Sequence, residues 1–263
     1  MSNSNKSPYP AYTPYYERDG ISIVHADCRD IIPLIEPSTV DLVLTDPPYG
    51  VTGNDWDTAP DWNWLWSSLR STARAGAAMV LFGQDAFTAQ MICSNAKDYR
   101  YSLVWEHDRT SGFLDAARKP LRSHQDIAVF YQSQPTYRPL LWQGDPQHGR
   151  GRPSRKQSSN YGAYQNLEGT PGNPEKQPRS VLYFPKPHPC VHPNEKPVAL
   201  MEYLIRTYTD PGDLVLDLYA GSGPIARAAM MAGRRCIAIE SEEKYCEIAV
   251  RRLQQAVLPL EVA

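Results

Sequence analysis

The sequence predicts an α/β fold built on one mostly parallel sheet with helices on both faces. Three observations support this prediction: short apolar runs typical of buried strands, segments of helical period between these runs, and a length of 263 residues. Strands of parallel sheets are near-continuous apolar runs because helices cover both of their faces. The length is sufficient for one large domain with a full core, so a second complete domain is not required.

The first half of the chain alternates between the two kinds of segment. Residues 21–25 and 40–44 are predicted to be strands, and a helical turn through Ile31, Leu34 and Ile35 lies between them. The pattern then predicts, in order, a helix at 62–72, a strand at 77–82, a helix at 86–96, and strands at 101–105 and 127–131. One strand of the sheet is expected to run antiparallel to the others.

The pattern changes between residues 133 and 188, which are rich in Pro, Gly, Ser, Asn and Gln and carry many basic side chains. A loop of this length in a compact domain is usually functional or disordered, and a loop that becomes ordered only when it binds a partner is both. Regular structure resumes with, in order, a helix at 197–208, a strand at 214–218, a helix at 225–231, a strand at 236–239 and a helix at 242–255. We therefore divide the chain into an N-terminal arm (1–20), a first half-domain (21–132), a basic insertion (133–188) and a second half-domain (189–263).

Composition excludes several classes of protein. The formal net charge is −2, so a nucleic-acid partner requires a local basic patch. The five cysteines form no C-x-x-C pair, which argues against a disulfide framework and a zinc ribbon. Prolines separate His188, Cys190 and His192, so no metal site is predicted. No run approaches the roughly 18 apolar residues of a membrane span, and we expect a soluble protein of the reducing cytoplasm.

The first motif with chemical meaning is T-D-P-P-Y-G at residues 45–50, directly after a predicted buried strand. Pro47 and Pro48 have no N–H to donate and make the backbone stiff, which leaves its carbonyls free to accept. The carboxylate of Asp46 and the carbonyl of Pro47 can accept the two hydrogens of an exocyclic amine, while Tyr49 stacks on the base. The alternative is an ordinary strand-end turn capped by Asp46.

The second motif joins a predicted strand to a helix through Asp217, Gly221 and Gly223. The two glycines let the backbone approach a ligand closely, Asp217 suits a ligand ammonium, and Glu240 at the end of the next strand suits ribose hydroxyls. The third glycine of the pyrophosphate fingerprint is absent, which favours a ligand with an amino acid and a ribose but no phosphate. S-adenosylmethionine is such a ligand. The alternative is a purely structural turn.

With both motifs in this order, the chain resembles the amino-methylating DNA methyltransferases of the beta class, in which D-P-P-Y precedes the cofactor motif. The resemblance implies a Rossmann-like, circularly permuted methyltransferase fold and an S-adenosylmethionine cofactor. It places Asp27 beside the adenine ring of the cofactor, and Lys196, in H-P-N-E-K-P at residues 192–197, in its methionine pocket. It extends the cofactor turn to Tyr219 and Ser222. The sequence departs from the family at Leu218-Tyr219-Ala220 and at Pro224.

The implied reaction is direct methyl transfer to a base flipped out of double-stranded DNA. By resemblance, an Asp at position 46 favours adenine N6, whereas a Ser favours cytosine N4, so N4-cytosine methylation is the alternative. A non-catalytic DNA-binding relative is a second alternative. The family implies a restriction-modification setting and favours a homodimer. In the basic insertion, Arg150, Arg152, Arg155 and Lys156 are predicted to contact DNA phosphates, unless the segment is only a solvated loop.

Overall fold

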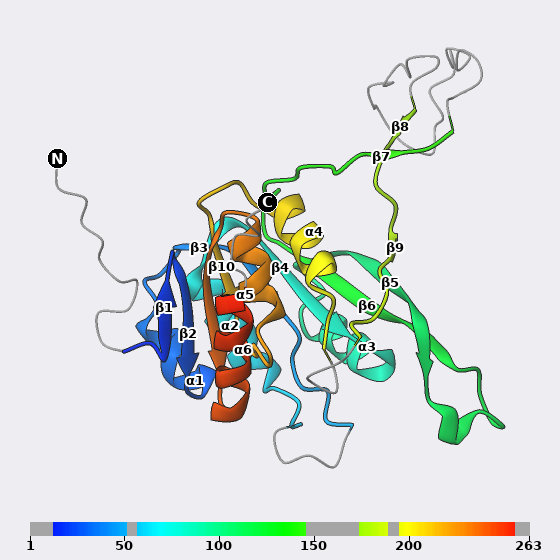
Figure 1. The fold of residues 1–263 in the computed structure, drawn as a ribbon, viewed down its shortest axis with the longest axis horizontal. Helices are drawn as coiled ribbons and strands as arrows, with labels where there is room; N and C mark the ends of the chain where they lie inside the picture. The colour runs from blue at the N-terminus through cyan, green and yellow to red at the C-terminus, as the bar shows by residue number, and fades with distance from the viewer. Residues whose placement is uncertain (1–12, 52–56, 146–173, 189–194, 256–263) are drawn as a thin grey trace, which may run out of the picture. The chain divides into compact units, whose positions relative to one another are not determined.

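A computed structural model of the protein describes residues 13–51, 57–145, 174–188 and 195–255. The chain divides into two compact units: Met1–Arg138 together with Ser180–Ala263, and Pro139–Arg179. The larger unit contains a nine-stranded sheet and the six described α-helices (Figure 1). The fold class predicted from the sequence is confirmed, because the sheet is mostly parallel and mixed with helices.

The sheet has the strand order β1-β2-β11-β10-β3-β4-β6-β5-β9 (Figure 1). Its strands are β1 (Tyr16–Arg18), β2 (Ile21–His25), β3 (Val40–Thr45), β4 (Ala73–Gly83), β5 (Tyr99–Ser111), β6 (Arg122–Phe130), β9 (Val181–Tyr183), β10 (Leu214–Asp217) and β11 (Arg235–Glu240). Neighbouring strands are parallel except where β1 pairs with β2 and where β6 pairs with β4 and β5.

Two of these strands therefore run antiparallel, where the sequence predicted one. The expected antiparallel strand is β6, and the additional one is β1 at the edge of the sheet. Strand β1 lies in the segment predicted to be a loose arm. Its three residues are mostly exposed, so they show no buried alternation, and backbone pairing with Ile21, Ser22 and Ile23 of β2 holds them instead.

Helices cover both faces of the sheet, as the sequence predicted. The helices are α1 (Cys28–Ile31), α2 (Trp62–Thr72), α3 (Asp85–Ser94), α4 (Val198–Tyr208), α5 (Pro224–Met231) and α6 (Glu243–Gln255), with short 3₁₀ turns η1 (Ile32–Leu34) and η2 (Phe113–Asp115). One core cluster joins α4, α5 and α6 to side chains such as Leu42 and Leu44 of β3. The other joins α1, α2 and α3 to side chains such as Val43. Successive β3 side chains thus enter opposite cores, which explains why the strand is buried throughout.

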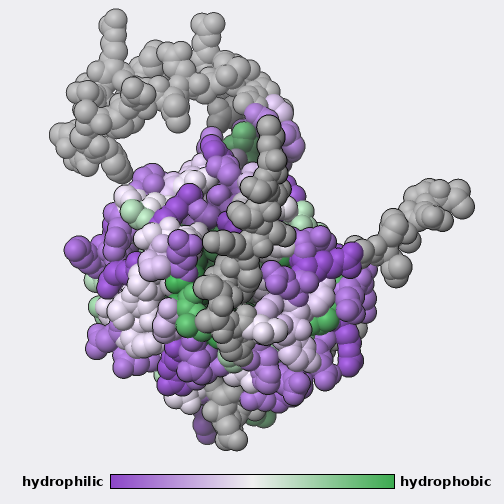
Figure 2. Space-filling model, turned by 90° about the vertical axis from the view of Figure 1, so that its left-hand side faces the viewer, coloured by the Kyte–Doolittle hydropathy of each residue, from purple (hydrophilic) through white to green (hydrophobic). Residues whose placement is uncertain are grey.

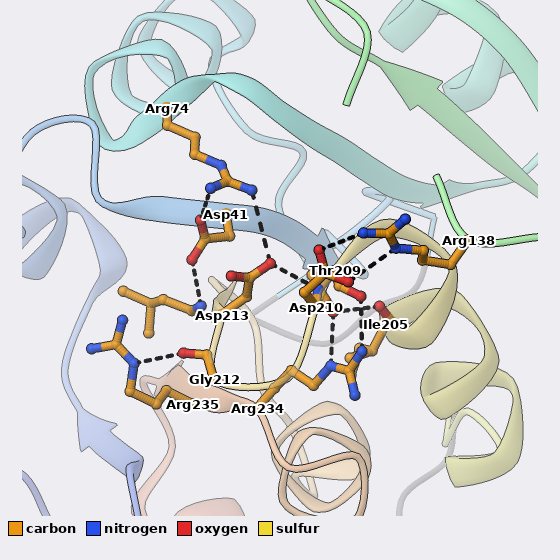
Figure 3. Close-up of polar contacts among 11 residues, drawn as sticks. Asp41, Arg74, Arg138, Ile205, Thr209, Asp210, Gly212, Asp213, Arg234 and Arg235 are labelled. Carbon is orange, nitrogen blue, oxygen red and sulfur yellow. Dashed lines mark hydrogen bonds and ion pairs between the residues drawn. The ribbon is translucent and has the colours of Figure 1, made fainter. Parts of the chain in front are cut away.

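The amino ends of the central strands carry a network of paired charges (Figure 3). Asp41 at the start of β3 forms an ion pair of 2.7 Å with Arg74 at the start of β4. The other carboxylate oxygen of Asp41 accepts the backbone N–H of Leu214 at 2.7 Å. Asp213, which precedes β10, lies 3.8 Å from Arg74 and accepts the N–H of Asp210 at 2.8 Å. Each acidic group here has a partner, so this network ties the strand starts together.

The smaller unit, Pro139–Arg179, contains a second, two-stranded sheet. Strands β7 (Trp142–Gln143) and β8 (Glu175–Lys176) pair antiparallel, and the Trp142 indole N–H donates to the carbonyl of Gln177 at 3.0 Å. The four residues predicted to contact phosphates, Arg150, Arg152, Arg155 and Lys156, lie outside the described residues. The end of the predicted insertion, residues 180–188, belongs to the larger unit, where β9 joins the main sheet.

The surface at the β1 edge of the sheet is mainly hydrophilic, with hydrophobic residues only in small patches (Figure 2). Scattered apolar residues of this kind are ordinary for a protein surface. Among the described residues, no helix combines the length and the apolar character that crossing a membrane requires.

Candidate active site

Both motifs end neighbouring strands at the carboxyl edge of the sheet, so they face one cavity. Strand β3 leads into Asp46, and β10 ends at Asp217. From β10 the chain continues to β11 on one side, whereas from β3 it continues to β4 on the other, so the strand order reverses between them. Open α/β sheets bind ligands at such a reversal. A cavity of about 820 Å³ lies there, lined by residues of both motifs.

Most of the predicted site residues line this cavity. From the first motif these are Asp46, Pro47, Pro48 and Tyr49, and from the predicted cofactor set they are Asp27, Lys196, Asp217, Tyr219, Gly221, Ser222 and Glu240. Gly223 is not at the lining. It lies at the start of α5 with φ of 74°, and a Cβ there would meet the Cβ of Ala249 at 2.7 Å. A glycine is therefore required at position 223 both for backbone conformation and for helix packing.

The Asp46 carboxylate is held by two side chains. The hydroxyl of Tyr49 donates to one of its oxygens at 2.6 Å, and the ammonium of Lys196 pairs with the other. Burial, and then the negative charge of Asp46, raise the pKa of Tyr49 well above its ordinary value, so its phenol stays a donor. The cavity thus holds a fixed carboxylate that keeps lone pairs for a further donor.

Lys196, which the resemblance assigns to the methionine pocket, lines the shared cavity, and that assignment stays a prediction. Its ammonium lies against Asp46 and 5.1 Å from the ring centre of Phe82. Its side chain is only 5% exposed. The two residues are 150 positions apart, and no local pattern in the sequence links them. Lys196 therefore touches the first motif in addition to lining the shared cavity.

Asp57 organises the loop that follows Tyr49, and the sequence did not single it out. Its two carboxylate oxygens accept the backbone N–H groups of Gly50 at 2.9 Å and Val51 at 3.0 Å. Asp57 is 8% exposed and lines the cavity. Two consecutive N–H groups bound to one carboxylate fix the backbone directly after the motif.

Thr45 connects the two motifs. Its hydroxyl donates to Asp217 at 2.9 Å and accepts the backbone N–H of Leu218 at 3.2 Å. Thr45 is fully buried and directly precedes Asp46. The sequence placed Thr45 in the first motif without assigning it a role, because its partners lie more than 170 residues away.

Asp217 has the features of a group that binds a cationic ligand. It is fully buried, and one of its oxygens accepts from Thr45 and from the Tyr219 N–H, whereas its Oδ2 has no partner among the described residues. Burial, more than the charges of Asp46 and Glu240, raises the pKa of Asp217 to about 7. A buried carboxylate oxygen without a partner is costly, so its persistence points to function.

The rest of the second motif supplies hydroxyl and backbone contacts. Glu240 accepts the N–H of Gly221 at 2.7 Å and that of Glu242 at 2.9 Å, which orients its carboxylate along the cavity wall. The Ser222 hydroxyl is buried and has no hydrogen-bond partner in the described part of the chain. With the free oxygen of Asp217, these groups fit a ligand that carries both an ammonium and vicinal hydroxyls.

The start of α1 contributes a further part of the cavity wall. Asp27 caps this helix by accepting the N–H of Arg29 at 2.8 Å, and its carboxylate also pairs with the Arg29 guanidinium at 3.0 Å. Tyr219 is hydrogen-bonded to the thiol of Cys28, and burial raises the pKa of that thiol to about 11. These contacts fix Asp27 and Tyr219, which both line the cavity.

The opposite wall consists of polar residues that the sequence did not predict. Gln84 directly follows β4, Ser111 ends β5, and β6 contributes Arg122 and Gln125. The side-chain oxygen of Gln125 is buried and has no partner among the described residues. Within the described ranges, no group of three or more His, Cys, Asp or Glu side chains is arranged to hold a metal ion.

Comparison with known proteins identifies a family. The family model N6_N4_Mtase, described as DNA methylase, matches residues 40–251. The chain is 25% identical over 251 residues to the DNA adenine methyltransferase YhdJ of Escherichia coli K12, covering 89% of this chain and 83% of that protein. It is 26% identical over 266 residues to the type II methyltransferase M2.LlaDCHI of Lactococcus lactis subsp. cremoris, covering 92% of each.

Solved structures share the fold. The crystal structure of the M1.HpyAVI–SAM complex has a TM-score of 0.61 at 23% identity, covering 89% of this chain and 100% of that one. The PvuII DNA methyltransferase (cytosine-N4-specific) has a TM-score of 0.68 at 14% identity, covering 96% and 92%. The relation of this motif order to a permutation stays a prediction.

The family match spans the strand that leads into Asp46, the cofactor turn and most of the last helix. The family uses S-adenosylmethionine, whose ammonium and ribose suit the free oxygen of Asp217 and the carboxylate of Glu240. The chain therefore belongs to the DNA methylase family that methylates adenine N6 or cytosine N4.

Proposed function

We propose that the protein transfers a methyl group from S-adenosylmethionine to N6 of an adenine in double-stranded DNA. The observation that carries this proposal is one cavity with two aspartates of opposite role. Asp46 is a carboxylate held by Tyr49 and Lys196, and Asp217 has a free buried oxygen. The first suits the target amine and the second suits the ammonium of the cofactor.

The chain's own groups would perform three tasks. Asp217 holds the cofactor ammonium and Glu240 its ribose hydroxyls, and the bound cofactor supplies an activated methyl group. Asp46 and the Pro47 carbonyl accept the two hydrogens of the amine, which directs the nitrogen lone pair away from the ring plane. Tyr49 stacks on the flipped base, and its hydroxyl steadies Asp46. The extra proton on the product nitrogen leaves to water, so no covalent enzyme intermediate is required.

Adenine is proposed over cytosine because position 46 is an aspartate, the residue that the adenine branch of the family favours. N4-cytosine methylation is the second candidate, since the same two acceptors hold either amine. We also propose that the Pro139–Arg179 unit contributes target recognition, with Arg150, Arg152, Arg155 and Lys156 on phosphates. A homodimer is a further expectation from the family, and sedimentation of the purified protein tests it.

The test is to incubate the protein with unmethylated genomic DNA and labelled S-adenosylmethionine, digest the DNA to nucleosides and identify the labelled base by mass spectrometry. We expect N6-methyladenine. If the labelled base is N4-methylcytosine, the mechanism stands and the target base is cytosine instead of adenine. No label in DNA, with the cofactor still bound, would overturn the activity in favour of a non-catalytic DNA-binding role. A parallel reaction with an Asp46→Ala variant excludes a contaminating host enzyme.

A further inference from the structure

The hairpin that joins β5 to β6 projects away from the helices that cover the sheet (Figure 1). Strand β5 runs in the same direction as β4, so it ends at the carboxyl edge of the sheet, where the active site lies. Ser111 at the end of β5 pairs with Arg122 at the start of β6, and both residues line the cavity. Residues 112–121 form the turn beyond this last pair. The turn therefore directly follows two residues of the cavity wall.

The tip of this hairpin presents two large apolar side chains to water. Phe113 is 69% exposed and Leu114 is fully exposed. Gly112, with φ of 91°, lets the chain turn sharply into η2, and the Asp115 N–H donates back to the Gly112 carbonyl at 3.0 Å. The Arg118 N–H then donates to the Asp115 carbonyl at 2.8 Å. A short hydrogen-bonded turn thus holds the apolar pair outward, which costs free energy unless a partner covers it.

The charge around the apolar pair favours a polyanionic partner. Residues 109–122 contain four basic side chains and one acidic one. Within the described part of the chain, Arg118 makes no ion pair, and Lys119 pairs only with Asp115, at 3.6 Å. Both basic side chains are exposed, so they are able to reach phosphates on either side of the tip.

The base of the hairpin is anchored to the neighbouring segment. The guanidinium of Arg109 donates to the carbonyl of Pro187 at 2.6 Å, and the N–H of Lys186 donates to the carboxylate of Asp108 at 2.8 Å. Arg122 is paired with Asp85 at the start of α3. An anchored hairpin is able to transmit force to a duplex, whereas a loose loop would yield.

We propose that the Phe113–Leu114 tip is a wedge that enters the DNA stack at the target site and keeps the target base out of the helix. This inference rests on the proposed function. Phe113 follows Ser111, which lines the cavity, by two residues, so the two Cα atoms lie within about 7 Å of each other, or roughly two base-pair steps of 3.4 Å. Apolar side chains inserted between base steps unstack them, and the loss of stacking is compensated by contacts with the distorted duplex.

The experiment compares two duplexes that differ only in the base opposite the target. In one the target adenine is paired with thymine, and in the other it faces a mismatch that lowers the cost of flipping. The variant Phe113→Ser with Leu114→Ser removes the wedge. We expect its kcat/KM to fall about 30-fold on the paired duplex and less than about threefold on the mismatched one, since a few kcal/mol of unstacking is the step that the wedge supports.

Two further variants make the result decisive. Met231→Ser is the matched control, because Met231 is 48% exposed at the end of α5 and distant in the fold from the hairpin; it should match the wild type on both duplexes. The swap Phe113→Leu with Leu114→Phe keeps the apolar volume and should restore activity. An unchanged melting temperature and unchanged cofactor affinity show that the serine variant is folded.

Several outcomes would overturn the wedge. If the serine variant loses kcat/KM equally on the two duplexes, or on neither, the tip has no role in base flipping, and the proposed methylation is unaffected. A serine variant that instead loses self-association, with unchanged preference between the duplexes, would make the tip a protein contact. If the wild type methylates neither duplex nor genomic DNA, the proposed function fails, which is distinguishable from failure of the wedge alone.

Discussion

The central strands β3 and β10 carry one buried aspartate at each edge of the sheet, and the two aspartates differ in whether the protein supplies partners for both carboxylate oxygens. At the amino end, Asp41 pairs with Arg74 and accepts the Leu214 N–H, and neither of its oxygens is left without a partner (Figure 3). At the carboxyl end, Asp217 is more deeply buried, yet its Oδ2 has no partner among the described residues. Burial alone therefore does not distinguish a structural acid from a ligand-binding one. The difference is whether the protein itself satisfies the carboxylate.

The largest effect is expected at Asp46, which directly follows β3. Asp46→Ala should lower the methylation rate by on the order of 10³-fold, because it removes an acceptor that orients the target amine. Cofactor affinity, measured by calorimetry, should change by less than about threefold, since the proposed role of Asp46 is to hold the target amine and not the donor. A parallel loss of cofactor binding would contradict this assignment.

The second expected effect is a pH dependence of cofactor binding that originates in Asp217. Only the ionised carboxylate attracts an ammonium, and the pKa of Asp217 is raised to about 7 by burial. Cofactor affinity should therefore increase roughly five- to tenfold between pH 6 and pH 7.5, as the ionised fraction rises. Asp217→Asn should bind about 100-fold more weakly and show no such increase.

The same pKa links Asp217 to stability, with a defined sign. Its pKa in the folded protein lies above the ordinary value of 3.8, so the folded state binds the proton more tightly than the unfolded state. The contribution of Asp217 to stability is fully present below pH 3.8 and is lost as the pH rises to about 7. Urea unfolding should thus find Asp217→Asn more stable than the wild type at pH 8 and closer to it at pH 5. The reverse order would contradict a carboxylate without a partner.

The smallest effect is expected at the amino end, and on stability only. Asp41→Ala breaks the contacts with Arg74 and Leu214 and should lower the free energy of unfolding by about 2 kcal/mol. Its kcat and cofactor affinity, measured where the variant is fully folded, should equal those of the wild type. A change in kcat would contradict the assignment of a structural role to the amino edge of the sheet and a functional role to the carboxyl edge.

Much of the fold could be predicted from local pattern. Strand β3 and helix α2 lie where apolar periodicity and turn residues placed them, because both signals are contained in a few consecutive residues. Strand β5 is longer than predicted. The sequence predicts a strand at residues 101–105, whereas β5 comprises Tyr99–Ser111. The added residues are mostly polar, and three of them, Tyr99, Glu106 and Ser111, pair with β6, which no local pattern reveals.

The candidate site was predictable as a set of loops but not as a set of contacts. The two motifs can be recognised from consecutive residues of the sequence. They lie side by side because they follow neighbouring parallel strands, whose carboxyl ends meet at one edge of the sheet. The partners within the site could not be read in this way: Thr45 contacts Asp217, and Lys196 contacts Asp46, across 172 and 150 residues. Asp57 is near in sequence, but a carboxylate in a polar segment is ordinarily solvated, so its role depends on the folded loop.

The strand order also constrains how the protein forms during synthesis. Between β2 and β3, which are near neighbours in the chain, the sheet contains β11 and β10 from the far end of the sequence. On a ribosome, β2 has only β1 to pair with until residues 235–240 have emerged. The centre of the sheet closes last, and the edges of β2 and β3 stay open until then. Such distant pairing makes folding slow and leaves nascent chains exposed to aggregation.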